Sequence, residues 1–119
     1  MLDFETRRNL LFSLAAERLS AFYEHGQWLT EAQGATLAGL WLSRAKLQLP
    51  QAERRMLSDL SDTLARQIAG SLSREAGLYT AHEMTEALDP NYRSDTVFNL
   101  FDECERLLRE QEREPGMGA

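Results

Sequence analysis

The sequence has almost no β-branched aliphatic residues, since Ile68 and Val97 are the only isoleucine and valine among 119 residues. In their place, leucine occurs 20 times and alanine 14 times. Leu and Ala lose little conformational freedom in a helix, whereas Ile and Val are typical of strands. The composition therefore argues against a sheet and predicts an all-α protein of one domain's length.

Long apolar runs and cysteines are also scarce. No apolar run approaches the roughly 20 residues that a membrane-spanning helix needs, so we expect no membrane span. The single cysteine, Cys104, excludes an internal disulfide and a cysteine-rich zinc site. Residues Met1–Leu10 contain two acidic and two basic side chains instead of a signal-peptide pattern. These features together predict a cytoplasmic protein.

Positive charge is scarce in the second half of the chain. Residues 1–60 hold seven basic and seven acidic side chains, whereas residues 61–119 hold six basic and twelve acidic ones, so this half carries the whole net charge of −6. Proteins bind DNA non-specifically through cations that neutralise phosphates, so this balance disfavours nucleic acid. It favours a basic protein as the partner.

Apolar residues at helical spacing predict a compact bundle of about five helices. Caps and breakers set the bounds: Asp3 suits an N-cap, Gly26 a C-cap, and Pro50 the first turn of a helix. We interpret residues 71–77 as a connector. The predicted helices cover residues 4–24, 31–47, 50–69, 81–88 and 95–110. Residues 1–110 then form a single domain, and residues 111–119 a flexible C-terminal tail.

Two capping boxes are predicted, in each of which a Thr side chain and a Glu or Gln three residues later satisfy each other's backbone amides. The first joins Thr30 and Gln33, and the second joins Thr80 and Glu83. Tyr79 and Met84 flank the second box at the spacing of a hydrophobic staple.

Motifs for catalysis are absent from the sequence. It has no glycine-rich phosphate loop and no G-x-S-x-G. Cys104 falls on the apolar face of the last helix, which predicts a buried thiol rather than a nucleophile. His82 and Glu86, four residues apart, would supply only half of a metal site. We therefore expect no enzyme activity and no catalytic, cofactor-binding or metal-binding residue.

Residues 79–108 read as a Thr-capped short helix, a turn, and a longer helix that begins near Ser94. This pattern resembles the helix-turn-helix of winged-helix regulators, which implies a DNA-binding transcriptional regulator as the alternative function. The resemblance would place DNA contacts at the start of the recognition helix, on Arg93, Ser94, Thr96 and Asn99. The sequence departs from the family in two ways. Asp95, Asp102, Glu103 and Glu105 would repel phosphate, and no β-hairpin is predicted after the last helix.

The function we predict is that of a small acidic, non-catalytic regulator, adaptor or inhibitor that occupies a surface of a larger, basic protein. Small bacterial, plasmid or phage proteins that cover a basic site fit this profile by analogy. Aromatic, arginine and acidic side chains outside the core stripes are the candidate interface residues. They are Trp28, Tyr92, Arg93, Phe98, Asp102, Glu103 and Glu105.

A strip of small residues in the second predicted helix suggests close approach by another helix, and hence a homodimer. The strip is made of Gly34, Ala35, Ala38 and Gly39 with Leu42. A third function, that of a structural subunit in a larger assembly, is not separable from the protein-binding reading by sequence.

Overall fold

The computed structural model describes residues 3–87 and 94–113, and all its regular structure in these ranges is helical. The five helices are α1 (Phe4–His25), α2 (Glu31–Arg44), α3 (Gln51–Ser71), α4 (Arg74–Glu86) and α5 (Asp95–Arg113). This confirms the all-α prediction. Four helices both start and end within three residues of the predicted bounds, and α4 is the exception because it starts seven residues early. The segment 111–113, assigned to the tail, is helical.

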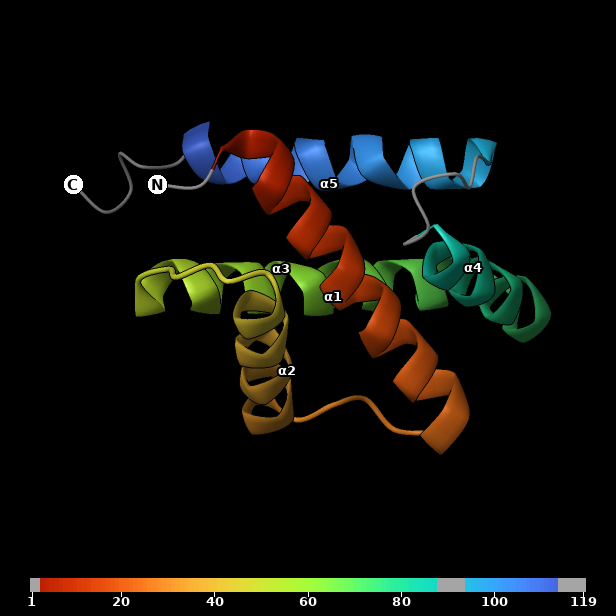
Figure 1. Cartoon of the computed structure of the whole chain (residues 1–119). Coiled ribbons are helices and arrows are strands. Elements are labelled where there is room, and N and C mark those ends of the chain that lie inside the picture. The colour runs from red at the N-terminus through yellow and green to blue at the C-terminus, as the bar shows by residue number, and fades with distance from the viewer. Residues whose placement is uncertain (1–2, 88–93, 114–119) are drawn as a thin grey trace.

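Helix α1 lies at the centre of the bundle and packs against each of the other four helices. Figure 1 shows it crossing α3 and α5, which run antiparallel to each other, while α4 packs at one end and α2 on the opposite side of α3 from α5. Residues 10–16 of α1 are all buried, so the middle of this helix has no solvent-facing side. The fold is therefore a core helix inside a shell of four helices.

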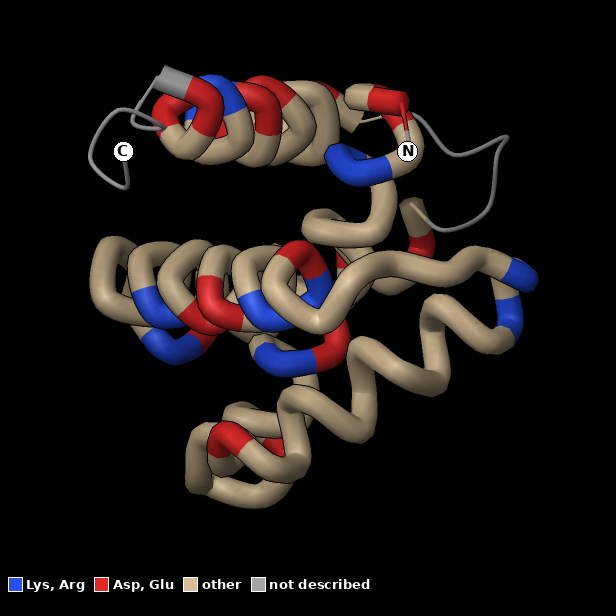
Figure 2. Tube along the Cα trace, turned by 90° about the vertical axis from the view of Figure 1, so that its left-hand side faces the viewer, with Lys and Arg blue, Asp and Glu red and all other residues tan. Residues whose placement is uncertain are grey.

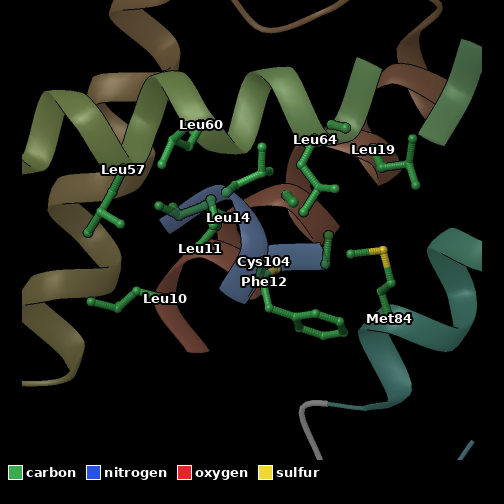
Figure 3. Packing of buried hydrophobic residues seen from close by; sticks show 14 of the residues in the cluster. Leu10, Leu11, Phe12, Leu14, Leu19, Leu57, Leu60, Leu64, Met84 and Cys104 are labelled. Carbon is green, nitrogen blue, oxygen red and sulfur yellow. The ribbon is translucent and has the colours of Figure 1, made fainter. Parts of the chain in front are cut away.

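The core is made mostly of leucines from α1 and α3, joined by side chains from α4 and α5. Leu57, Leu60 and Leu64 of α3 point toward Leu11 and Leu14 of α1 (Figure 3). The buried Met84 of α4 and Cys104 of α5 reach the same cluster. Phe12 is 1% exposed, and its ring stacks on Phe101 with 4.4 Å between ring centroids.

The helix starts follow local hydrogen bonding that the sequence indicates. Asp3 accepts a hydrogen bond of 2.8 Å from the Thr6 amide. Hydrogen bonds with the side chain of Thr6, first, and with its amide lower the pKa of Asp3. The capping box of Thr30 and Gln33 has both of its hydrogen bonds, at 2.9 and 3.2 Å. Gly26 ends α1 with a φ of 73°, a left-handed conformation that glycine adopts without strain.

The capping box predicted at Thr80 is wrong. Helix α4 begins seven residues earlier, where the Ser73 hydroxyl accepts a hydrogen bond of 3.2 Å from the Ala76 amide. Thr80 is buried in the middle of the helix, and Tyr79 is exposed rather than stapled to Met84. A hydrogen bond with Glu83 raises the pKa of the Tyr79 hydroxyl. Residues 74–77, taken as part of a connector, are thus helical.

Helix α4 continues through Gly77 because α1 requires a glycine there. A Cβ at this position would lie 1.7 Å from the Tyr23 hydroxyl oxygen. Packing of Tyr23 against Gly77 offsets the low helix propensity of glycine. Helix propensities describe local preferences and do not include such tertiary contacts.

Candidate functional site

A hollow with apolar walls and a volume of about 460 Å³ forms a groove between α3 and α5, which Thr80 of α4 also lines. Its walls are Leu64, Ile68 and Leu72 from α3 and the residue after it, and Leu100 from α5. Leu64 and Ile68 belong to the core cluster, so the floor of the groove is the core itself. Leu72 is 39% exposed at the end of α3. We call this surface the α3–α5 groove.

The rim of the α3–α5 groove is polar and carries one ionised group. Gln67 and Ser71 line the α3 side, and Thr96, Asn99 and Glu103 line the α5 side. Arg106 donates hydrogen bonds of 3.1 Å from Nε to the Glu103 carboxylate. These bonds lower the pKa of Glu103, so that it stays ionised at neutral pH. The rim therefore combines a fixed negative charge with neutral hydrogen-bonding groups.

Acidic side chains predominate along α5, with arginines between and beside them (Figure 2). Most of these carboxylates already have a partner. Glu105 lies 3.0 Å from Nη1 of Arg8, and Glu112 lies 3.2 Å from Nη2 of Arg7. Asp95 and Asp102 have no ion pair within the described part of the chain. The free negative charge of α5 is thus smaller than its composition suggests.

The structure divides the predicted interface residues among three places. Glu103 lies on the rim of the α3–α5 groove with Thr96 and Asn99, two of the predicted DNA contacts. Phe98 is 51% exposed. By helical spacing, Phe98, Asp102 and Glu105 share a face of α5 that differs from the face toward the groove. Tyr92 and Arg93 lie outside the described residues.

Trp28 lies far from α5, in the connection between α1 and α2 on the opposite side of α3 (Figure 1). Its ring is half-buried and stacks on Phe22 at 4.0 Å. The guanidinium carbon of Arg66 lies 5.0 Å from the centroid of the Trp28 ring, in a cation–π contact. Trp28 therefore anchors the connection to α1 and α3, and it forms no common surface with the α5 residues.

The geometry of residues 79–108 differs from the pattern that suggested a helix-turn-helix. The first helix is 13 residues long rather than short, and it starts before Thr80. Ser94 and Thr96 are half-buried, while Asn99 is exposed. No strand that would form a wing occurs in residues 3–87 or 94–113.

The small-residue strip of α2 is used inside the chain. Gly34, Ala38 and Leu42 are buried against the bundle, while Gly39 is half-buried and a Cβ placed on it would meet nothing within 4 Å. A Cβ at Gly34 would lie 2.0 Å from Nη2 of Arg18. At Gly34, the close approach predicted for this strip is therefore made by Arg18 of α1 in the same chain.

Sequence reasoning overlooked Arg18, which is a charged residue only 3% exposed. Its Nε donates to Ser61 Oγ and its Nη2 to Ser58 Oγ, both at 2.8 Å, and Nη1 lies 3.4 Å from Asp62 Oδ1. Burial lowers the pKa of Arg18. Its position beside Leu19, on the apolar stripe of the first helix, was a signal in the sequence that an arginine enters the core.

Cys104 is fully buried, as predicted, and burial raises the pKa of its thiol from 9.0 to about 12. The thiolate is the reactive form, so the folded protein should hold about a thousandfold less of it at pH 8 than the unfolded chain does. We expect no alkylation of Cys104 by iodoacetamide in native protein and rapid alkylation in guanidinium chloride, measured by mass spectrometry. Equal rates in both conditions would contradict the buried thiol.

Metal ligands are not gathered anywhere in the described part of the chain, where no group of three or more His, Cys, Asp or Glu residues could hold an ion. His82 Nε2 lies 3.7 Å from Glu86 on the exposed face of α4.

Among the described residues, no helix is both long and apolar enough to cross a membrane.

Comparisons of this chain with protein-family models, with curated proteins and with solved structures give no significant match. The functional argument therefore depends on the geometry of the chain's own surface.

Proposed function

We propose that the protein is a non-catalytic binding module that holds a helix of a larger, basic protein in the α3–α5 groove. The observation that carries this proposal is the set of apolar walls, Leu64, Ile68, Leu72 and Leu100, at a hollow on the surface. A groove with apolar walls between two helices suits the apolar face of an amphipathic helix. By binding and covering a helix of its partner, such a module would act as a regulator, adaptor or inhibitor.

The charge of the protein supports a basic partner. The net charge is −6, and all of it comes from residues 61–119. Glu103 is ionised on the groove rim, and Asp95 and Asp102 have no ion pair among the described residues. Complementary charge speeds association and orients the partner, while the apolar groove supplies most of the binding free energy.

Replacing Leu72 or Leu100 with aspartate should weaken partner binding at least tenfold. The new carboxylate would be buried against the apolar face of the partner's helix and would lose its hydration there. The partner is identified first, by cross-linking in the native host from a photoreactive amino acid placed at Leu72. Binding of each variant to that partner is then measured by titration calorimetry.

The matched control is Leu40→Asp, because Leu40 is 51% exposed on α2, away from the groove. This variant should bind as the wild type does. Equal loss of binding in all three variants, or in none, would show that the groove is not the docking surface.

The DNA-binding alternative is tested on the same preparation with random duplex DNA at about 50 mM salt. We expect no binding. Binding that weakens steeply with salt and is reduced by Arg93→Ala would instead favour the transcriptional regulator.

A homodimer is tested by sedimentation. Loss of the dimer in Leu72→Asp would show that a second copy of the chain occupies the groove.

A further inference from the structure

A second hollow, of about 430 Å³, lies where α1, α2 and α3 meet. It opens on a different face of α3 from the α3–α5 groove, since the two share no lining residue. Its lining includes three arginines, Arg18, Arg55 and Arg66, which are nearly a quarter of the chain's 13 basic residues. Three carboxylates, those of Glu31, Asp59 and Asp62, line it as well. We call it the Arg18 pocket.

Arg18 brings a buried charge to this pocket. A guanidinium has five N–H donors, and three of those of Arg18 bind Ser58, Ser61 and Asp62, which leaves two. Burial is the largest cause that lowers the pKa of Arg18, and together with the charge of Arg66 it outweighs the nearby Asp62 and Asp59, which raise the pKa. The carboxylates of the chain therefore compensate only part of the hydration that this guanidinium has lost, and an added anion would complete it.

Two carboxylates that line the pocket, Asp62 and Asp59, differ in their partners. Asp62 is shared by two guanidiniums, because Nε of Arg66 lies 3.0 Å from one of its oxygens and Nη1 of Arg18 3.4 Å from the other. Positive charge thus exceeds negative charge at that end. Asp59, in contrast to Asp62, has a carboxylate that makes no hydrogen bond or ion pair within the described part of the chain. A ligand with both an anionic and a cationic group matches this arrangement.

We propose that the Arg18 pocket binds a small zwitterion of the free amino acid class, with its carboxylate toward Arg18 and Arg66 and its ammonium toward Asp59. Exposed Arg55 and Glu31, 3.3 Å apart, line both the pocket and a neighbouring hollow of about 220 Å³. Ala35 and Ala38 form the apolar wall of that second hollow, which gives room for an aliphatic side chain. This proposal does not depend on the function proposed for the α3–α5 groove.

The experiment measures thermal unfolding of the full chain with each proteinogenic amino acid in turn at about 10 mM, because a ligand of the folded state raises the melting temperature by mass action. Acetate and methylamine, which carry one charge each, are measured at the same concentration. We expect at least one amino acid to raise the melting temperature in a concentration-dependent way, and neither single ion to do so. The dissociation constant is then measured by calorimetry.

Two substitutions test the residues. Asp59→Asn removes the ammonium partner at an exposed position, and Arg18→Met removes the buried cation while keeping a long side chain. Each should raise the dissociation constant of the amino acid at least tenfold. Asp102→Asn removes an exposed carboxylate from α5, outside the pocket, and should leave the constant unchanged. Circular dichroism checks the fold of each variant, and Asp59→Asn decides alone if Arg18→Met does not fold.

Three results would overturn the proposal. The first is that no amino acid raises the melting temperature. The second is that acetate raises it as much as the best amino acid does, which would make the pocket a site for anions alone. The third is that Asp59→Asn binds the amino acid as tightly as the wild type, which would place the ligand elsewhere.

Discussion

Replacing Phe12 with alanine is expected to lower the free energy of unfolding by about 3–5 kcal/mol. The Phe12 side chain is 1% exposed at the centre of α1, and its ring stacks on Phe101 of α5 at 4.4 Å. The substitution removes buried apolar area and leaves a cavity in the part of the core where α1 meets α5. Chemical denaturation followed by circular dichroism measures the change.

The control for Phe12→Ala is Leu40→Ala, because Leu40 is a large apolar residue that is 51% exposed on α2. Its truncation should change the free energy of unfolding by no more than about 0.5 kcal/mol. A loss at Phe12 as small as that at Leu40 would mean that α5 does not pack on α1 as described.

Replacing Arg18 with alanine should cost about 2–4 kcal/mol, the range for truncating a long buried side chain. Its guanidinium packs against Gly34 of α2, and alanine would leave that space empty. Arg18→Met, by contrast, should stay within about 1 kcal/mol of the wild type, because the carboxylate left behind, Asp62, is 33% exposed and keeps Arg66 as its partner, so that no buried charge is left unpaired. Both values come from denaturant titration.

The small cost of Arg18→Met follows from the hydrogen bonds that its partners keep. Ser61 Oγ still donates to the Ser58 carbonyl at 2.7 Å, and Asp62 still accepts from Arg66. Ser58 lines the Arg18 pocket, where water can reach its hydroxyl. A loss in Arg18→Met as large as in Arg18→Ala would show instead that the charge itself holds α1 on α3.

The helical bounds could be predicted where the start signal is local. Asp3, Thr30 and Pro50 each act through backbone groups within a few residues, and helices begin beside all three. The start predicted at Thr80 is wrong because this segment contains two possible N-caps. The N-cap used is Ser73, which makes α4 about two turns longer at its start. Packing of Tyr23 on Gly77 stabilises the longer helix, and that contact joins residues far apart in the sequence.

The candidate sites were less predictable than the helices, for the same reason. Leu72 and Leu100 are ordinary leucines in the sequence, and only the spacing of α3 from α5 makes them walls of a groove. The Arg18 pocket is lined by residues from three helices. The sequence identified none of these residues as a candidate for ligand binding. The acidity of α5 was visible in the composition, but its pairing with Arg7 and Arg8 was not, because about a hundred residues separate the partners.

The central position of α1 has a consequence for how the protein folds during synthesis. Helix α1 leaves the ribosome before the other four, yet part of its cover is α5, and the Arg8–Glu105 contact closes a loop of 97 residues. The apolar middle of α1 is therefore incompletely covered until translation has passed α5, and such nascent surface is prone to aggregate. Stable structure in this chain should form only after the last helix has emerged, as one cooperative unit rather than helix by helix.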